Sequence, residues 1–316
     1  MKFTVTGDIG MDDVNNAKGG TEMMKESLLK RLPPELSEPF NIICSRVRKI
    51  SKDKKNLLWL HDTWNDPEVQ HLREEDSLKR FEKLIFVSNY QFQTYHLAHQ
   101  LPYSKAIVLK NAIEPIPDHD KSTEGPINLI YHTTPHRGLE LLYPVFDFLW
   151  NNAWEGKIHL DVYSSFKIYG WPHRDEQYEE LFDNCKKHPG ITYHGFVSND
   201  EIRKALEQAH IFAYPNIWPE TSCISLMEAM SAKCAVVCPN YAALPETAAG
   251  FANMYQFEED MNTHANKFAN LLNMILHHYF HENHMSKLNF QKTYADNFYS
   301  WDSRISEWQA FLKGLL

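Results

Sequence analysis

Short apolar segments alternate with polar or amphipathic segments along most of the chain. The runs KFTVTG, FNIICS, NLLWLH, KLIFVS and KAIVLKN predict five buried strands within residues 2–111. Polar or helical segments separate the later strands. Near-continuous apolar strands that alternate with helices are typical of a parallel sheet covered on both faces. The first part of the chain is therefore predicted to be a doubly wound α/β unit.

The alternation stops once and then restarts. Residues 113–126, IEPIPDHDKSTEGP, contain prolines, a glycine and several charges, which is typical of an interdomain linker. The runs INLIYHT, IHLDVYS, ITYHG, HIFAYP and CAVVCP then predict a second set of strands. One helix between them should begin at Ser198, because Ser198 and Glu201 have the spacing of a capping box.

These patterns predict two domains, which suits a chain of 316 residues. We divide the chain into an N-terminal domain (1–114), a linker (115–126), a C-terminal domain (127–299) and a final helix (300–316). Two successive doubly wound units place a cleft between them, with ligand sites at the carboxyl ends of the strands. The final helix is amphipathic and is expected to return to the N-terminal domain; its apolar positions are Trp301, Ile305, Trp308 and Leu312.

The charge balance argues against nucleic acid as a partner. The formal net charge is −9, whereas binding of a phosphate backbone needs clustered positive charge. The exception is Arg46–Lys55, RVRKISKDKK, which has six cations and one aspartate. Two interpretations of this segment stay open: a solvated loop, or a patch that contacts an anionic acceptor or a membrane surface.

The cysteines and the N-terminal segment predict a cytoplasmic protein. Five cysteines are an odd number, and no CxxC pair is present, which favours a reducing compartment. The apolar stretch of MKFTVTGDIG is too short for a signal peptide, and no run approaches the length of a membrane span. Peripheral membrane contact, if present, would be made through Arg46–Lys55.

Two glutamates, Glu220 and Glu228, lie eight positions apart where the strand HIFAYP passes into a helical segment. The free N–H groups of a helix start near Ser222 to Ser225 would form an anion site. A carboxylate repels a phosphate, but it accepts hydrogen bonds from the hydroxyls of a sugar or ribose. The alternative is structural, since Ser225 and Glu228 also fit a capping box and Glu220 suits the helix dipole. The spacing alone leaves both interpretations open.

A second junction, YHTTPHRGLELL, places Arg137 and Gly138 at a turn, with Thr133 and Thr134 just before them. A guanidinium at a helix N-terminus is unfavourable against the helix dipole unless an anion lies between them. Arg137 is therefore a candidate phosphate ligand. The alternative is a lone exposed arginine.

Two features of the N-terminal domain are candidates for substrate contact. Gly19 and Gly20 follow the first predicted strand and precede a helix, where glycine allows close backbone approach to a ligand. His61 and Asp62 end a buried strand and would face the cleft. An ordinary turn and a structural histidine are the alternatives.

The histidine-rich segment HHYFHENH, residues 277–284, does not predict a metal site. His277 and His281 have i, i+4 spacing, but no carboxylate or cysteine set completes a coordination shell. The sequence also lacks GxSxG, Walker A and Cys–His nucleophile patterns. We therefore expect no metal and no cofactor.

Together these motifs resemble the retaining glycosyltransferases of the GT-B type, specifically the large glycosyltransferase group 1, or family 4. The block ETSCISLMEAMSAKCAVVC…ALPET is similar to the E-x7-E region of that family and its following Gly-Gly-x-x-Glu element. HRGLELL resembles its Arg/Lys-Gly-Leu turn, GGTE its first loop, and FVSNYQFQTYHL and VLKNAIEP the end of its N-terminal domain. The resemblance covers essentially the whole chain. It implies an α/β GT-B fold, with two Rossmann-like domains facing across a cleft.

The resemblance also implies roles for individual residues. Glu220 would contact hydroxyls of the transferred sugar, Glu228 the ribose, and Arg137 the diphosphate. His61 would contact the sugar near the reacting carbon, and Gly20 would approach from the other domain. The remaining implied donor-binding residues are Gly19, Thr133, Thr134, Gly138, the amides of Ser222, Cys223 and Ile224, and the base-binding residues His194, Gly195, Phe196 and Val197.

The implied activity is transfer of a hexosyl or pentosyl group from a nucleotide-diphosphate sugar to a glycan, glycolipid or surface-polysaccharide acceptor, without a metal. Retention would follow from a same-face, leaving-group-assisted displacement. Two alternatives keep the fold: a sugar-nucleotide epimerase or glycan phosphorylase, and a catalytically silent nucleotide-sugar-binding subunit. There are departures from the family pattern, and one is that the basic residue usually found a few positions before the Lys-Gly turn has no match at Tyr131 or His132. Lys233 replaces a glycine, Ala242-Ala243-Leu244 replaces a Gly-Gly or Gly-Ala element, and the N-terminal unit is short, which implies a trimmed acceptor surface.

Overall fold

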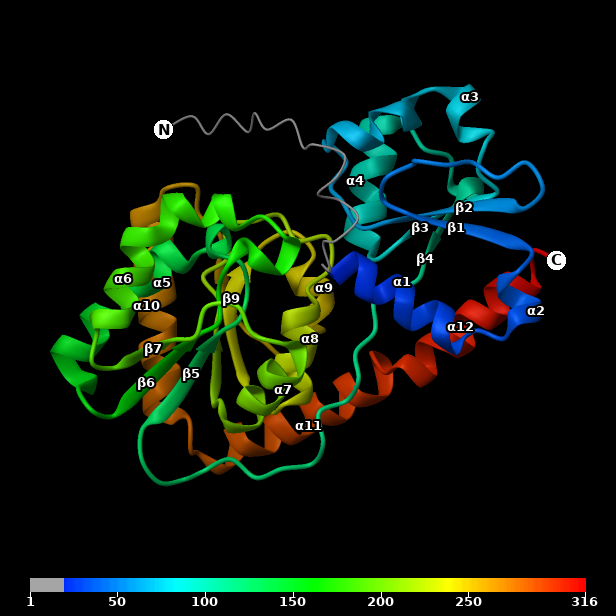
Figure 1. The fold of residues 1–316 in the computed structure, drawn as a ribbon. Coiled ribbons are helices and arrows are strands. Elements are labelled where there is room, and N and C mark those ends of the chain that lie inside the picture. The colour runs from blue at the N-terminus through cyan, green and yellow to red at the C-terminus, as the bar shows by residue number, and fades with distance from the viewer. Residues whose placement is uncertain (1–19) are drawn as a thin grey trace.

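The structure, a computed structural model, describes residues 20–316 and contains two parallel β-sheets in two domains (Figure 1). The predicted strand within KFTVTG lies outside the described residues, as does Gly19. The N-terminal sheet has the strand order β1-β2-β3-β4. Its strands are β1 (Phe40–Cys44), β2 (Lys55–Leu60), β3 (Lys83–Phe86) and β4 (Ala106–Val108).

Alternation along β2 explains why both faces of the N-terminal sheet are covered. Leu57 and Trp59 belong to one apolar cluster, whereas Leu58 and Leu60 belong to another. The helical segment predicted between β2 and β3 is shorter than a full helix: it consists of a 3-10 turn, η2, and the four-residue α3. The helical elements of this domain are α1 (Gly20–Arg31), α2 (Pro34–Ser37), η2 (Pro67–Arg73), α3 (Glu75–Leu78), α4 (Asn89–His99) and η3 (Tyr103–Lys105).

The C-terminal sheet has six strands in the order β10-β9-β8-β5-β6-β7. The strand β10 was missed by the sequence pattern. The chain runs outward from β5 to β7 and then returns to the opposite side of β5, so the strand order reverses between β5 and β8. Ligands of open parallel sheets bind at such a switch point. The strands are β5 (Ile127–Tyr131), β6 (Ile158–Val162), β7 (Ile191–Tyr193), β8 (Ile211–Ala213), β9 (Ala235–Asn240) and β10 (Asn253–Gln256).

Helices cover this second sheet on both faces (Figure 1). The capping box predicted at Ser198 and Glu201 is confirmed at the start of α7. The α-helices are α5 (Leu139–Leu149), α6 (Glu179–Lys187), α7 (Asn199–Gln208), α8 (Ile224–Ser231), α9 (Leu244–Ala248), α10 (Met261–His278) and α11 (Glu282–Phe298). Shorter turns are η4 (Pro135–Arg137), η5 (Trp150–Trp154), η6 (Phe166–Tyr169) and η7 (Pro172–Tyr178).

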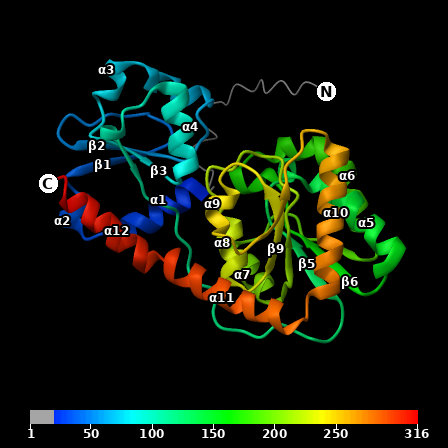
Figure 2. The ribbon, with the colours of Figure 1, turned by 180° about the vertical axis from the view of Figure 1, so that it is seen from behind.

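Two chain segments cross between the domains. The first follows β4, and the second connects α11 to α12 (Trp301–Lys313), which lies against the N-terminal domain in both views (Figures 1 and 2). The two crossings run side by side, since Ile113 and Ser300 form a parallel bridge. The indole rings of Trp308 and Trp59 lie 4.9 Å apart, edge to face, so α12 completes the core of the first domain. Within residues 20–316, no helix combines the length and apolarity needed to cross a membrane.

Candidate active site

The loops that follow β5 and β8 meet at the switch point of the C-terminal sheet. Arg137 from the first loop forms an ion pair with Glu220 from the second. The Tyr214 hydroxyl donates to the same carboxylate oxygen of Glu220, Oε1, at 2.5 Å, and Arg137 Nε donates to Thr134 Oγ1 at 3.1 Å. All the contacts to the Glu220 carboxyl group are made at Oε1, so Oε2 has no hydrogen-bond partner among the described residues.

Burial controls the charges in this cluster. It would lower the pKa of Arg137, but the nearby Glu220 carboxylate outweighs it and holds that pKa well above the ordinary value. Burial and the same carboxylate raise the pKa of Tyr214 well above its usual range. The cluster is therefore a guanidinium, a carboxylate and a neutral phenol that acts as the donor.

Gly138 allows the two loops to approach this closely. Its φ of 126° lies in a region that disfavours side chains, and an added Cβ would lie 2.2 Å from the carbonyl oxygen of Pro215. Any other residue would push the Arg137 turn away from the Glu220 loop. Steric contact with Pro215 therefore explains why the HRGLELL turn has a glycine at position 138.

The helix α8 begins beside Glu220 without a side-chain cap. Its N-cap is Cys223, so Ser225 lies within the first turn and the capping box predicted from Ser225 and Glu228 is wrong. The uncapped N–H groups of the first turn are available to an anion. Two hydroxyls on these loops, Ser222 Oγ and Thr133 Oγ1, are buried and have no hydrogen-bond partner among the described residues.

Glu228 lies one turn into α8 and is half-buried. Burial raises the pKa of its carboxyl group to about 7, while Arg203 partly opposes that rise. No side chain or backbone group among residues 20–316 is hydrogen-bonded to this carboxyl group. Glu228 therefore does not cap the helix.

The N-terminal domain reaches the same loop through His61 and Gly20. The backbone carbonyl of His61 accepts a hydrogen bond from Thr221 Oγ1 at 2.6 Å. Both ring nitrogens of His61 are buried and unpaired among the described residues, and burial lowers the pKa of the ring to about 4, so it is neutral. A Cβ added to Gly20 would lie 3.4 Å from Ile224 Cδ1, so the start of α1 touches the start of α8.

The residues proposed to bind a base lie in the loop after β7, at the sheet edge. The His194 ring stacks on Tyr163 with centroids 4.1 Å apart, and its Nε2 lies 2.7 Å from Asp161 Oδ1. Gly195 has a φ of 67°, and Phe196 is 52% exposed. Val197 is half-buried. This loop makes no hydrogen bond to Arg137 or Glu220, so it forms a separate part of the candidate site.

Sequence reasoning gave no role to Glu246, Ser88 or Tyr214. Glu246 accepts hydrogen bonds from the backbone N–H groups of Asn89 and Tyr90, at 3.0 and 2.9 Å, and pairs with Lys110. A carboxylate of the C-terminal domain thus stabilises the N-terminus of α4 in the other domain. The Ser88-to-Gln91 spacing is a recognisable cap, but no local signal pairs Glu246 with a residue more than a hundred positions away.

Two of the positions that depart from the family pattern, Lys233 and Ala242, have a left-handed backbone. Lys233 has a φ of 57° and Ala242 a φ of 53°, which glycine adopts without strain. Lys233 Nζ also donates to the His119 carbonyl at 2.9 Å. The conformation expected of glycine is therefore kept by residues with side chains.

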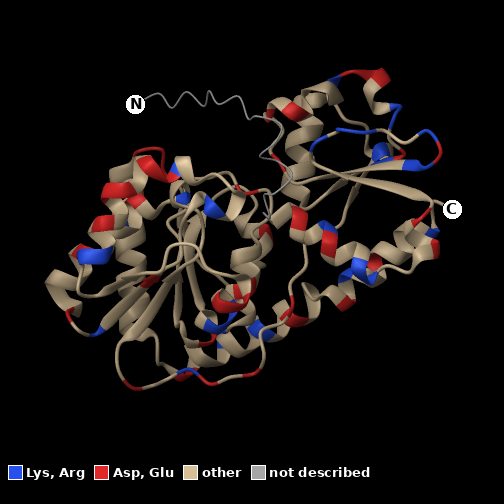
Figure 3. Cartoon of the chain, viewed as in Figure 1, with Lys and Arg blue, Asp and Glu red and all other residues tan. Residues whose placement is uncertain are grey.

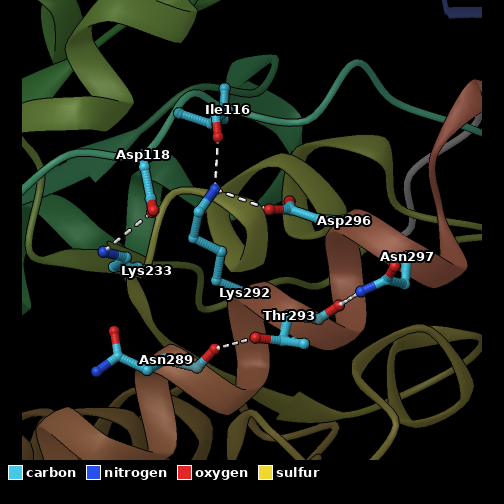
Figure 4. Close-up of a pocket in the computed structure, with 8 residues that line it drawn as sticks. All are labelled: Ile116, Asp118, Lys233, Asn289, Lys292, Thr293, Asp296 and Asn297. Atoms are coloured by element: carbon cyan, nitrogen blue, oxygen red, sulfur yellow. Dashed lines mark hydrogen bonds and ion pairs between the residues drawn. The ribbon is translucent and has the colours of Figure 1, made fainter.

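Two cavities lie away from this site. One, of about 460 Å³, lies between the linker and α11 (Figure 4), and its charges are paired: Lys292 with Asp296 at 2.8 Å and Lys233 with Asp118 at 3.5 Å. The other, of about 450 Å³, is lined in part by Lys25, Lys49 and Lys54.

The basic segment Arg46–Lys55 forms most of the loop between β1 and β2 on the N-terminal domain (Figure 3). It is partly neutralised, since Arg48 forms a two-point pair with Glu68, at 2.7 and 3.1 Å. Among residues 20–316, no group of three or more His, Cys, Asp or Glu side chains is arranged to hold a metal ion.

Comparison with known proteins assigns the family. The model of the glycosyl transferases group 1 matches residues 118–289, more than half of the chain, so the protein belongs to that family. No curated protein matches the sequence closely enough to add an assignment.

Solved structures agree on the fold. A glycosyltransferase from Rickettsia africae ESF-5 matches with a TM-score of 0.69 and 15% identity, over 100% of this chain and 84% of its own. HepE from Anabaena, solved with UDP-glucose, matches with a TM-score of 0.64 and 12% identity, over 83% of this chain and 72% of its own. Sucrose-phosphate synthase from Thermosynechococcus elongatus matches with a TM-score of 0.63 and 13% identity, over 88% of this chain and 73% of its own. The two parallel-sheet domains therefore have the predicted GT-B fold.

Proposed function

We propose that this protein is a retaining glycosyltransferase of family 4 that moves a sugar from a nucleotide-diphosphate donor to a glycan, glycolipid or surface-polysaccharide acceptor. The observation that carries the proposal is the Arg137–Glu220 pair at the switch point, beside the uncapped start of α8. A cation and free helix amides recognise a diphosphate, while the carboxylate recognises hydroxyls. Membership of the group 1 family supports this assignment, as does the UDP-glucose in the HepE structure.

The donor would lie along the carboxyl ends of β5, β8 and β7. Arg137 and the amides of Ser222, Cys223 and Ile224 would contact the diphosphate. The unpaired hydroxyls of Thr133 and Ser222 are further donors, and Glu228 would accept from the ribose hydroxyls. The exposed ring of Phe196, with the Tyr163–His194 stack beside it, offers aromatic surface for a base.

Glu220 would act on the sugar through its second carboxylate oxygen. Arg137 and Tyr214 hold Oε1, which leaves Oε2 to accept a hydrogen bond from a hydroxyl of the transferred sugar. The neutral ring of His61 would hydrogen-bond the sugar from the opposite domain, because a neutral imidazole has one donor and one acceptor nitrogen. These contacts would orient the reacting carbon toward the acceptor.

In the proposed reaction, the bond between the anomeric carbon and the diphosphate oxygen breaks as the acceptor oxygen bonds to the same face. The acceptor proton passes to the departing diphosphate oxygen, so no protein nucleophile is needed. Arg137 and the α8 N-terminus would stabilise the negative charge of the leaving group. We propose that these groups suffice without a metal ion, so transfer should survive EDTA, and an absolute need for Mn²⁺ would contradict this part of the mechanism.

The first test is a thermal-shift screen of the purified chain against UDP-, GDP- and ADP-sugars. A ligand that binds only the folded state raises the unfolding temperature. At least one nucleotide sugar should do so, and Arg137→Ala should reduce the shift. If no nucleotide or nucleotide sugar shifts the transition, donor binding at this site is wrong.

A further inference from the structure

Thr221, the residue after Glu220, is hydrogen-bonded to the other domain on two sides. Its side-chain hydroxyl donates to the His61 carbonyl at 2.6 Å, and its own carbonyl accepts from Ser88 Oγ at 2.6 Å. We propose that Thr221 is a positioning residue, which sets the Glu220 carboxylate against the His61 ring by joining the two domains. The inference rests on the proposed function only in assigning both side chains to the transferred sugar.

Ser88 is suited to this link by its second hydrogen bond. Its side chain is buried, with 1% exposure, and its hydroxyl accepts from the Gln91 N–H at 3.0 Å, which caps α4. A hydroxyl has one proton and two lone pairs, so donating to Thr221 and accepting from Gln91 use it without conflict. Ser88 therefore anchors Thr221 to the start of a helix in the N-terminal domain.

Gln91 carries the connection onward to both sides of His61. Its side-chain Nε2 donates to the carbonyls of Leu60, at 3.2 Å, and Asp62, at 2.8 Å. Its Oε1 accepts from the Val87 N–H at 2.9 Å, and the side chain is fully buried. The hydrogen bonds thus form a closed ring that runs from Thr221 through Ser88 and Gln91 to the backbone around His61, and back to Thr221.

The ring lies where small displacements matter most. Glu220 precedes Thr221 directly, so a shift of the Thr221 backbone moves the carboxylate. Displacement of a reacting group by about 1 Å can lower a rate by about a hundredfold. The Glu246 contacts with Asn89 and Tyr90 also join the domains, but they touch neither His61 nor Thr221. Thr221 is thus linked directly to the backbone of both residues whose side chains are proposed to bind the sugar.

The test compares Thr221→Val, Thr221→Ser and Ser88→Ala with a matched control, Thr293→Val. Thr293 is exposed on α11, and among the described residues its hydroxyl bonds only to the Asn289 carbonyl of its own helix. Turnover is measured as release of free sugar from the nucleotide sugar found in the thermal-shift screen, and UDP affinity is measured by calorimetry. Thr221→Val should lower kcat about tenfold or more, which corresponds to about 1.4 kcal/mol or more. The Kd for UDP should change by a smaller factor than kcat, because Ser222 is the one proposed diphosphate contact that adjoins Thr221.

Restoration of kcat by Thr221→Ser separates a positioning role of the hydroxyl from a general loss of structure. Thr221→Ser keeps the hydroxyl and should restore kcat to within about threefold of wild type, and Thr293→Val should match wild type. A kcat for Thr221→Val within about twofold of wild type would overturn the proposal, as would an equal loss in Thr221→Ser. Should Thr221→Val fail to fold, Ser88→Ala reads the same link, and an unchanged kcat there would also overturn it.

A second measurement does not depend on activity. If wild type releases sugar from no donor in the absence of an acceptor, small-angle X-ray scattering tests the link alone. Thr221→Val and Ser88→Ala should increase the radius of gyration relative to wild type and Thr293→Val, since the domains separate more readily. Identical scattering from all four proteins would overturn the inference that Thr221 holds the domains together.

Discussion

The Arg137 guanidinium pairs with the Glu220 carboxylate across the switch point between β5 and β8. The two residues are 83 positions apart in the chain, and Gly138 allows their loops to meet. A bound diphosphate would compete with Glu220 for this guanidinium. Under the proposed function, the pair would hold the cation in place before the donor arrives and share it afterwards.

This competition predicts opposite effects of two substitutions on UDP binding. Arg137→Ala removes a charge-assisted contact and should weaken UDP binding by about tenfold or more, at about 1.5–3 kcal/mol per bond. Glu220→Gln frees Arg137 and should leave UDP affinity equal or higher, although transfer should be abolished. Calorimetric titration with UDP checks both, with Arg48→Ala as a distant arginine control. Weaker UDP binding by Glu220→Gln would contradict the competition.

Glu220→Gln should also have a measurable cost in stability. From the sequence alone, this substitution would be expected to leave folding almost untouched. The structure revises that expectation, because the substitution leaves the half-buried Arg137 without its ionic partner. The free energy of unfolding should fall by about 1–3 kcal/mol, which denaturant titration measures. A stability equal to wild type would show that the pair does not persist in solution.

Glu228 predicts a pH dependence of donor binding. Its pKa of about 7 means that the carboxyl group is largely protonated at pH 6 and largely ionised at pH 8. The ionised form accepts better from ribose hydroxyls, so affinity for the nucleotide sugar should rise up to about tenfold over this range. Glu228→Gln should remove the dependence. A nucleotide sugar is a better probe than UDP, because its diphosphate has no terminal phosphate group that titrates between pH 6 and pH 8.

The same group predicts the sign of a stability change. The folded-state pKa, about 7, is raised above the ordinary value of 4.5, so the folded state holds the proton between these values. The free energy of unfolding should therefore fall as pH rises from about 4.5 to about 7 and then level off. Subtracting the profile of Glu228→Gln isolates this contribution. A difference profile that is flat, or that rises with pH, would contradict the burial assigned to this carboxyl group.

Replacement of Ala242 by glycine is expected to stabilise the protein. The left-handed backbone of Ala242, with a φ of 53°, costs about 1–2 kcal/mol for a residue with a Cβ. Glycine would relieve this strain but raise the unfolded-state entropy by about 0.4–1 kcal/mol. Ala242→Gly should therefore stabilise the protein by about 0.5–1 kcal/mol. Ala205→Gly, in the middle of α7, should instead destabilise it by about 1 kcal/mol, and denaturant titration of both variants measures the contrast.

Truncation of Trp308, which lies near the C-terminus, is expected to destabilise the N-terminal domain. Its ring is fully buried against Trp59 in β2. Trp308→Ala should cost about 3–5 kcal/mol and accelerate hydrogen exchange in β1 and β2 before it does so in β5 or β9. Equal protection of β2 in the variant and wild type would show that α12 does not form part of this core.

Local patterns made much of this architecture predictable. Continuous apolar runs indicated the strands, and Ser198 with Glu201 marked a helix start, because these signals act over a few residues. The strand β10 was missed because NMYQ is only partly apolar and its burial pattern is weak. The Ser225–Glu228 capping box was wrong because the helix begins earlier, at a cysteine that carries no cap.

The site was predictable as a set of junctions but not as a set of contacts. Arg137 and Glu220 were both identified, yet nothing local shows that they pair. The Glu246–Lys110 and Thr221–His61 contacts join domains and depend on how two sheets face each other. Such contacts are tertiary, and one sequence carries no direct record of them.

The stereochemistry of the reaction tests the proposed retaining transfer most directly. The purified chain is incubated with the nucleotide sugar that it binds, and the first sugar released to water is followed by proton NMR before mutarotation. The anomeric configuration of the donor should be retained, and Glu220→Gln should release no sugar. Release of the inverted anomer, or full activity of Glu220→Gln, would contradict the proposal.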